Sequence, residues 1–177
     1  MARIIAIVSG KGGTGKTTTS VHLAAALSDL GEDVLLMDAD LQTPSVSVHL
    51  GEPEIPITIT EFIKGTDKLK NAIYKTTMGF KLLPASLSFT EFGRELSKLK
   101  TAMRKARKEA DYIIVDCPPG LGKTVKHVLK ESDEVLVVTN PELPAIADGI
   151  KSIKLAEQYD TTILGIVVNK ATNQSFE

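Results

Sequence analysis

Residues 10–17 constrain the fold of this chain more than any other segment. They read Gly10-Lys11-Gly12-Gly13-Thr14-Gly15-Lys16-Thr17 and fit the pattern G-x-x-x-x-G-K-[ST]. An apolar run at 4–8 precedes them, and residues with the apolar spacing of a helix follow at 16–30. A glycine-rich turn that only joins a strand to a helix is disfavoured, because the motif and its context agree. The sequence therefore predicts a strand–loop–helix unit that binds phosphate.

The residue types of this loop suit a nucleotide with magnesium. Glycines allow the backbone N–H groups to point inward at phosphate oxygens, and the start of the helix adds its positive end. The Lys16 ammonium supplies a full charge to the terminal phosphates, and the Thr17 hydroxyl is placed to bind Mg²⁺. We predict that the nucleotide contacts Gly10, Lys11, Gly12, Gly13, Thr14, Gly15, Lys16, Thr17 and Thr18.

A second lysine, Lys11, directly follows the first glycine of the loop. Since Lys16 already serves the phosphates within its own subunit, an ordinary loop of this kind does not need Lys11. The functional interpretation is that Lys11 reaches a nucleotide held by another subunit. The alternative is a solvated surface lysine, and the residues alone leave both open.

Short apolar runs alternate with helical patterns along the chain. We expect strands at 4–8, 34–37, 80–83, 112–115, 135–138 and 163–168, and helices at about 16–30, 94–110, 122–131 and 144–159. Most of the runs are apolar throughout, as in strands that helices cover on both faces. We therefore predict an α/β fold, doubly wound, with a mainly parallel sheet, in one P-loop domain over 1–177. In such folds ligands lie beyond the carboxyl ends of the strands.

Composition bounds the class of protein. The chain has 177 residues and a net charge of −1, so its overall charge does not indicate a polyanion binder. The single cysteine, Cys117, excludes an intramolecular disulfide and a cysteine-cluster metal site among these residues. Its place in an apolar strand indicates a buried, inert thiol. We see no signal peptide and no long apolar span, and so expect a cytoplasmic protein.

Two carboxylates follow the second strand, in Asp38-Ala39-Asp40. Residues at alternate positions of an extended segment point the same way. Beside a triphosphate, one carboxylate can hold water on the magnesium ion and the other can orient the attacking water. The alternative is helix capping or a solvated turn, because Pro44 and Ser45 indicate a turn into a short helix.

The fourth strand ends in a second acidic motif, Asp116-Cys117-Pro118-Pro119-Gly120-Leu121-Gly122. An apolar strand that ends in Asp is the second magnesium element of this class of nucleotidase, and its acid binds the ion through water. The Pro-Pro-Gly that follows is stiff and then permissive, which suits a segment that changes shape when the terminal phosphate leaves. Asp116 is therefore a candidate metal-binding residue.

The sixth strand ends in Val167-Val168-Asn169-Lys170. The Asn169 amide can donate and accept, which matches the edge of adenine, but Asn is also an ordinary turn residue. Thr139-Asn140-Pro141-Glu142, after the fifth strand, is expected to form another wall of that pocket. The guanine motif Asn-Lys-x-Asp is missing, because residues 169–172 read Asn-Lys-Ala-Thr, so we predict ATP or ADP rather than GTP.

A basic segment at 94–108 has an apolar stripe at helical spacing beside it. Its charged residues are Arg94, Lys98, Lys100, Arg104, Lys105, Arg107 and Lys108. We favour a helix that packs on the sheet with a solvated basic face. The alternative is a patch for DNA or an acidic partner, although the segment has no interleaved aromatic residues and no known groove-binding motif.

The motifs occur in the order found in the deviant Walker A ATPases. Together they resemble the MinD/ParA family, and most of all its MinD branch, which regulates the placement of cell division. The resemblance covers residues from about 2 to 170 and implies a P-loop ATPase fold of the SIMIBI type. It also implies ATP or ADP with Mg²⁺ as the cofactors.

The resemblance assigns roles to the catalytic set, Lys11, Lys16 and Asp40. Lys11 would contact phosphates across a face-to-face ATP dimer, Lys16 would bind phosphate, and Asp40 would help to activate water.

The resemblance also implies which residues would contact magnesium and adenine. Thr17 would bind the magnesium ion directly, while Asp38 and Asp116 would hold its water shell. Asn169 would contact adenine.

Resemblance to this family further implies a slow, partner-stimulated ATPase that forms an ATP-dependent homodimer and has an activating protein partner. Members continue past the sixth strand and commonly finish in an amphipathic membrane-targeting helix, which residues 173–177 do not form. We therefore expect the C-terminal part usual in the family to be absent here, and membrane association to depend on such a tail.

Three functions fit the sequence. The first is a MinD-like ATPase switch, and the second is a ParA- or Soj-like partition ATPase that binds DNA without sequence preference. The third is an iron–sulfur carrier of the Mrp type. That function needs paired cysteines, and these residues contain one.

Overall fold

The strands of this protein form a single mainly parallel sheet in the part of the chain that the computed structural model describes, residues 2–52, 55–87 and 97–172. The strand order is β3-β4-β2-β5-β1-β6-β7, and only the β3–β4 pair is antiparallel. The strands are β1 (Arg3–Val8), β2 (Val34–Asp38), β3 (Tyr74–Lys75), β4 (Lys81–Leu83), β5 (Tyr112–Asp116), β6 (Glu134–Thr139) and β7 (Thr162–Val168). The predicted doubly wound α/β class is confirmed.

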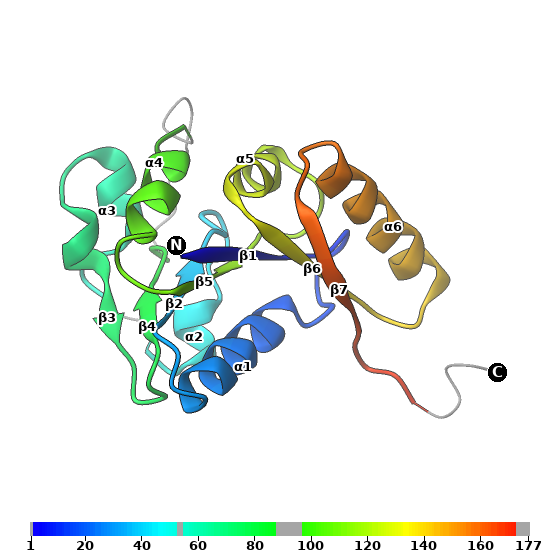
Figure 1. Cartoon of the computed structure of the whole chain (residues 1–177), viewed down its shortest axis with the longest axis horizontal. Helices are drawn as coiled ribbons and strands as arrows, with labels where there is room; N and C mark the ends of the chain where they lie inside the picture. Colours follow the sequence, from blue (N-terminus) through cyan, green and yellow to red (C-terminus); the bar gives the residue numbers. More distant parts are fainter. Residues whose placement is uncertain (1, 53–54, 88–96, 173–177) are drawn as a thin grey trace.

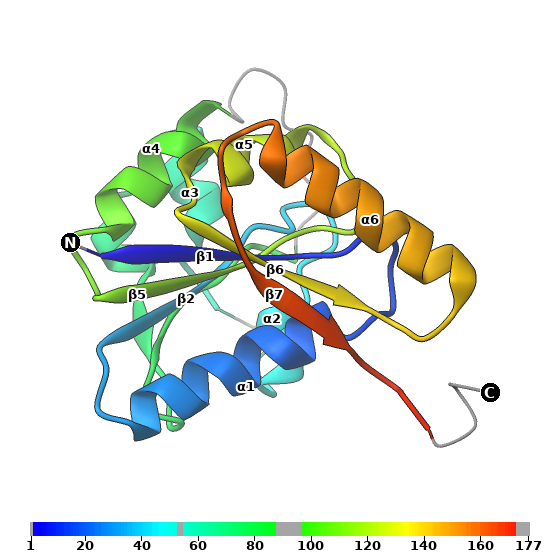
Figure 2. The ribbon, with the colours of Figure 1, turned by 45° about the vertical axis from the view of Figure 1, so that its right-hand side comes forward.

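Helices cover both faces of the sheet (Figures 1 and 2). They are α1 (Lys16–Asp29), α2 (Val46–His49), α3 (Ile59–Lys64), α4 (Ser97–Ala106), α5 (Lys123–Glu131) and α6 (Leu143–Glu157), with a short 3₁₀ helix η1 (Leu69–Ala72). In both views α1 and α2 lie on one side of the strands, and α3 to α6 lie on the other. Two covered faces explain why the central strands are apolar at every position rather than at alternate ones.

The core has two parts, one on each side of the sheet. Alternate residues of β1 point to opposite faces, so Ile4 joins a cluster with the inward sides of α4 and α5, and Ile7 joins a cluster with α1. Leu99 and Val128 represent the first cluster, and Val21 represents the second. All five of these side chains are at most 2% exposed. The loops at the carboxyl ends of the strands therefore stand on a rigid, close-packed base.

All six predicted strands and all four predicted helices are present, with small shifts of their ends. The predicted helix at 94–110 corresponds to α4; residues 94–96 lie outside the described part, and the helix ends at Ala106 because 107–109 close a turn. The sequence analysis missed β3, α3 and η1. The start of α3 carried a readable signal, since Thr58 and Glu61 form a capping box there.

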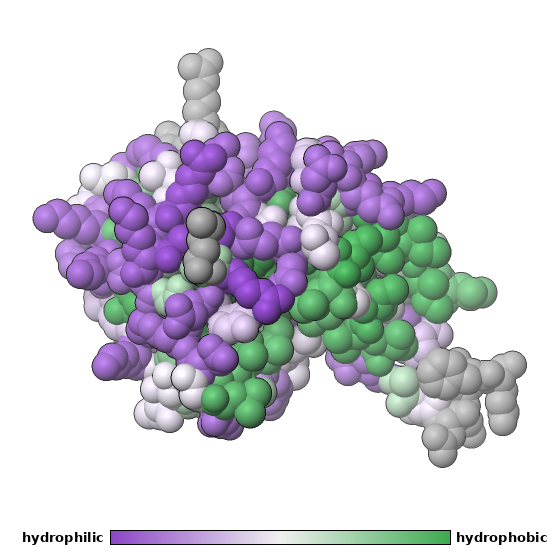
Figure 3. Space-filling model, viewed as in Figure 1, coloured by the Kyte–Doolittle hydropathy of each residue, from purple (hydrophilic) through white to green (hydrophobic). Residues whose placement is uncertain are grey.

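The edge strand β7 departs from the expectation that helices cover both faces of the strands. Ile166 and Val168 are 53% and 45% exposed, and Leu143 and Ile150 of α6 are exposed beside them. Figure 3 shows this apolar surface gathered over α6 and β7. None of the helices in the described ranges has the length and apolar character needed to span a bilayer.

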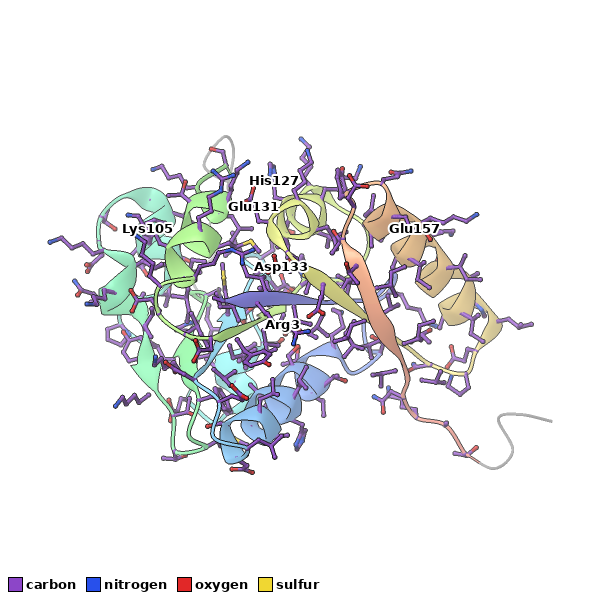
Figure 4. All side chains as sticks on the ribbon, in the orientation of Figure 1. Arg3, Lys105, His127, Glu131, Asp133 and Glu157 are labelled. Carbon is purple, nitrogen blue, oxygen red and sulfur yellow. The ribbon has the colours of Figure 1, made fainter. Side chains whose placement is uncertain are left out.

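The basic residues of α4 mainly make structural contacts. Arg104 and Lys100 of α4 both contact the carboxylate of Glu131, the last residue of α5, at 2.8 Å (Figure 4). Arg107 follows the helix and donates to the Ala2 carbonyl at 2.6 Å. The Lys105 ammonium lies 5.0 Å from the centre of the Phe62 ring. These contacts favour the packing interpretation over a nucleic-acid patch, while Arg94 lies outside the described residues.

We predict that Glu131→Gln lowers the free energy of unfolding by about 1 kcal/mol at neutral pH, the scale of a small ion-pair network. Burial would raise the pKa of Glu131, but hydrogen bonds from Lys100 and Arg104 outweigh it and hold the pKa below its ordinary value of 4.5. The ionised carboxylate therefore stabilises the fold fully above the ordinary pKa of 4.5, and this contribution is lost as the pH falls through the lowered pKa of the folded state. Urea unfolding of parent and variant should show a difference near pH 7 that shrinks as the pH is lowered below 4.5; a pH-independent difference would contradict the assignment.

Candidate functional site

The loop at 9–15 joins the carboxyl end of β1 to the start of α1. Gly13 and Gly15 have φ values of 73° and 97°, in the left-handed region that glycine adopts without strain. A Cβ atom on Gly15 would lie 2.1 Å from the Asn169 Nδ2 atom, whereas one on Gly13 would meet nothing within 4 Å. Glycine at position 15 therefore supplies the left-handed torsion and leaves room for the Asn169 amide.

Lys16 is the buried cation of the site, at 8% exposure. Its ammonium donates to the Ser9 hydroxyl at 2.9 Å, and that hydroxyl donates to the Lys11 carbonyl at 2.6 Å. Burial lowers the pKa of Lys16, and the nearby Asp116 opposes this change. An ammonium held at the base of a glycine loop is suited to bind phosphate oxygens, because a bound phosphate would give this buried cation a charged hydrogen-bond partner.

Two fully buried carboxylates face this loop from neighbouring strands. Asp38 ends β2 and Asp116 ends β5, and the two residues are paired in the parallel register. Asp116 accepts hydrogen bonds from the Thr17 hydroxyl at 2.7 Å and from the Ser20 hydroxyl at 2.9 Å. Burial, together with the charge of Asp116, raises the pKa of Asp38 to about 8. Burial also raises the pKa of Asp116, although these two hydroxyl donors oppose the change.

These oxygens fit Mg²⁺. The Thr17 hydroxyl lies 2.7 Å from an Asp116 carboxylate oxygen and 2.8 Å from the Ser45 hydroxyl, so hard oxygen donors converge on one point. Within the described ranges no three His, Cys, Asp or Glu side chains are grouped to hold a metal by themselves. Mg²⁺ commonly binds in this manner, through one or two carboxylates with phosphates and water completing its shell. Sequence reasoning identified Ser45 only as a turn residue.

Asp38 and Asp40 also make the contacts of the alternative interpretation, caps and turns. Asp38 accepts from the backbone N–H groups of Ser45 and Val46, at 3.1 and 3.2 Å, where α2 begins. Asp40, 7% exposed, accepts from the Thr43 N–H at 3.0 Å and from the Thr43 hydroxyl at 2.9 Å. The short helix indicated by Pro44 and Ser45 is therefore present as α2. These contacts confirm the interpretation as caps and turns, and the roles of Asp38 and Asp40 toward magnesium and water stay predictions.

Lys11 lies on the rim of the loop and forms an ion pair. Its ammonium is 2.8 Å from the Glu142 carboxylate, and the two side chains are 35% and 61% exposed. Within one subunit Lys11 therefore points to the segment after β6, and Lys16 points to the base of the loop.

A pocket of about 350 Å³ lies beside the loop. Its lining residues are Gly13, Gly15, Lys16, Thr17, Thr18, Asn169 and Lys170. The Asn169 amide donates to the Thr14 carbonyl at 2.9 Å, so Asn169 lines the predicted base pocket and also holds the loop. Sequence reasoning left Lys170 out of the site, because a lysine after a strand carries no motif by itself.

None of residues 139–142 is among the residues that line this pocket, so their expected place as another wall stays a prediction. Glu142 pairs with Lys11. Two buried side-chain oxygens among the described residues lack a hydrogen-bond partner, the Thr14 hydroxyl and the Asn140 carbonyl. Thr14 belongs to the phosphate loop itself, so a bound phosphate could give its hydroxyl a hydrogen-bond partner.

Cys117 lies next to the site but is 2% exposed. Burial and the charge of Asp116 raise the pKa of its thiol. The thiol therefore stays protonated at neutral pH, as the prediction of an inert cysteine requires.

Comparison with known proteins gives the family. A family model described as an AAA domain matches residues 2–166. An uncharacterized ATP-binding protein of Methanocaldococcus jannaschii is 37% identical over 178 residues, covering 100% of this chain and 67% of its own length. The septum site-determining protein MinD of Pyrococcus horikoshii, solved in complex with Mg-ADP, superposes with a TM-score of 0.88 at 32% identity and covers 98% of this chain and 73% of that one.

A second similar structure is the MinC:MinD cell division protein complex of Aquifex aeolicus, with a TM-score of 0.81, 32% identity and coverage of 94% of this chain and 68% of that one. The chain belongs to the family that the AAA-domain model describes and, within it, to the MinD/ParA-type ATPases. It spans about two thirds of the length of the curated relatives that it matches.

We predict that Gly15→Ala destabilises the protein more than Gly13→Ala does. Both substitutions place a Cβ on a left-handed residue, which costs about 1–2 kcal/mol. Only at Gly15 does the new atom also displace the Asn169 amide. Urea unfolding in the absence of nucleotide should give a larger loss for Gly15→Ala, and equal losses would show that the contact with Asn169 imposes no constraint.

Proposed function

We propose that this chain is a MinD-like, Mg-ATP-dependent ATPase switch that dimerises with ATP and contributes to the spatial placement of division or related machinery. The observation that carries the proposal is the convergence of the Lys16 ammonium, the Thr17 hydroxyl and the Asp38–Asp116 pair at one edge of the sheet. This set matches the triphosphate and metal of a P-loop ATPase. We also propose that residues 1–177 act as one nucleotide-binding domain.

The relatives support the choice of ligand and partner. One similar MinD was solved with Mg-ADP, and another was solved bound to MinC. We propose that this chain binds ATP and ADP with Mg²⁺ and that a protein partner stimulates its slow hydrolysis. The pocket beside Asn169, about 350 Å³, gives the adenosine moiety a place next to the loop.

Each residue has a distinct task in the proposed reaction. Lys16 would neutralise charge on the terminal phosphates, Thr17 would bind the metal, and Asp38 and Asp116 would hold its water shell. Asp40 orients the attacking water. Bound Mg²⁺ would stabilise negative charge on the phosphates.

The switch would use the segments that follow Asp40 and Asp116. A pocket of about 230 Å³ lies between 40–42 and 118–124. The N–H of Gly120 donates to the Ser9 carbonyl at 3.1 Å, which links this second segment to the base of the phosphate loop. Gly120 has a φ of 80°, so the segment turns at a residue free to change conformation. Loss of the terminal phosphate would release both segments together.

The alternative is a ParA- or Soj-like partition ATPase. It shares the nucleotide site and differs in its partner, DNA. The contacts of α4 with Glu131 and Phe62 disfavour a free basic face on that helix. An iron–sulfur carrier of the Mrp type is less favoured, because these residues include one cysteine and its thiol is buried. A filter-binding assay with double-stranded DNA separates the MinD-like function from the ParA-like one.

We predict that Asp40→Ala binds ATP but hydrolyses it about 10²–10⁴-fold more slowly, the usual loss when an aligned catalytic group is removed. Asp40 also accepts hydrogen bonds from Thr43, so the matched variant is Asp40→Asn, which keeps an acceptor for that turn and lacks the charge. Phosphate release under single-turnover conditions should be slow in both variants. Parent-like turnover in Asp40→Asn would show that Asp40 serves the turn alone.

We predict that ATP, and not ADP, favours a dimer, and that Lys11→Ala remains monomeric with both. A terminal phosphate contacted by Lys11 of the second subunit gains a charge-assisted hydrogen bond that exists only in the dimer. Light scattering in an Asp40→Ala background, which retains ATP, should show the difference. Lys75→Ala, an exposed lysine of β3 at the far edge of the sheet, is the control. Equal dimerisation of Lys11→Ala and its parent would make Lys11 a surface lysine.

A further inference from the structure

Lys170 has an unusual backbone for its residue type. It follows β7 directly, and its φ of 58° lies in the left-handed region, which few residues other than glycine adopt. Asp160, the other such residue in the described part, belongs to a type that tolerates this region better than lysine does. Strained backbone persists where surrounding contacts fix it, and it clusters at ligand sites. The contacts of Lys170 identify what fixes it.

The side chains of Asn169 and Lys170 hold two consecutive carbonyls of the phosphate loop. The Lys170 ammonium donates to the Gly13 carbonyl at 2.8 Å. The Asn169 amide donates to the Thr14 carbonyl at 2.9 Å, and its oxygen accepts the Lys170 N–H at 2.9 Å. The last bond fixes the backbone of Lys170 in the conformation from which its side chain reaches the loop. The end of β7 thus grips the loop at two adjacent peptide units.

Because peptide groups are planar, these two hydrogen bonds also set the direction of the Thr14 and Gly15 backbone N–H groups. In a trans peptide the C=O of one residue and the N–H of the next lie in one plane and point in opposite directions. Since Lys170 holds the Gly13 carbonyl, the Thr14 N–H points away from Lys170. Asn169 fixes the Gly15 N–H in the same way through the Thr14 carbonyl. Backbone N–H groups of this kind are the anion donors of a phosphate loop.

We propose that Lys170 is a positioning residue that sets the direction of the Thr14 N–H and so prepares the loop for the phosphates of a nucleoside di- or triphosphate. It acts through the Gly13 carbonyl and need not touch the base. The inference rests on the proposed nucleotide binding at 10–17 and is independent of dimerisation and hydrolysis. Lys170 also lines the pocket beside the loop, so a contact with the base is the competing role that the test must separate.

Three variants separate the side chain from the backbone. Lys170→Ala removes the contact with Gly13 and keeps a Cβ in the left-handed region. Lys170→Gly removes the contact and the strain together. Lys170→Arg restores a long cationic donor. Lys75→Ala, at the opposite edge of the sheet, is the matched control for loss of one exposed lysine.

Calorimetry with Mg-ATP and with magnesium and inorganic triphosphate is the first measurement. Lys170→Ala and Lys170→Gly should each bind both ligands about tenfold more weakly, as expected for loss of one hydrogen bond from a charged donor. Lys170→Arg should recover most of the affinity, and Lys75→Ala should match the parent. Weakened binding of ATP alone would assign Lys170 to the base and overturn the inference. A deficit that vanishes in 1 M salt, where the screening length is about 3 Å, would be long-range attraction and would also overturn it.

Hydrogen exchange of the loop amides in the protein without nucleotide is the second measurement. The Thr14 N–H should exchange faster in Lys170→Ala and Lys170→Gly than in the parent, because the peptide is no longer held. Unchanged exchange would overturn the inference even if affinity fell. If the parent bound neither ligand while the exchange rates differed as expected, the result would count against the proposed nucleotide binding. It would still support the hold of Lys170 on the Gly13 carbonyl. The two failures are thus distinguishable.

Discussion

The parallel pairing of β1, β2 and β5 is the constraint on which the site depends. Parallel strands end at the same edge of a sheet, so the register that pairs Asp38 with Asp116 also brings the loop after β1 beside them. Asp38 and Asp116 are 78 positions apart in sequence, yet each is within reach of the same loop because three strands share one direction. A shift by one residue would turn a carboxylate toward an apolar face of the sheet. The site is therefore a property of the register as much as of the side chains.

The same arrangement leaves the site electrostatically unbalanced. Asp38, Asp40 and Asp116 are buried around one buried lysine, Lys16, and the pKa of Asp38 is raised as a result. Buried like charges are costly unless a cation or hydrogen bonds compensate them. Backbone N–H groups and the hydroxyls of Thr17 and Ser20 supply part of that compensation. A divalent cation would compensate these carboxylates further, which is consistent with Mg²⁺ binding beside them.

The sequence predicted the fold and most of the site, and the reasons are local. The loop at 10–17, the apolar runs and the acids that end β2 and β5 are each read from neighbouring residues, and the parallel topology follows from their alternation with helices. The contacts of Ser45 and Lys170 were not readable, because they join segments 28 and 157 positions apart through side chains common in any turn. The segment 139–142 was assigned to the pocket from its place after β6, but the pairing of Glu142 with Lys11 is decided by tertiary packing.

The ion pair between Lys11 and Glu142 decides how readily Lys11 could leave Glu142 for a phosphate of a second subunit. Both side chains are substantially exposed, and such pairs contribute little to stability because water screens them. A phosphate contact sealed between two subunits would be formed in a less polar setting, where the same charge interacts more strongly. Lys11 therefore gives up little when it leaves Glu142. In the proposed ATP dimer, the ion pair would orient Lys11 within one subunit without competing seriously with a phosphate bound by the second subunit.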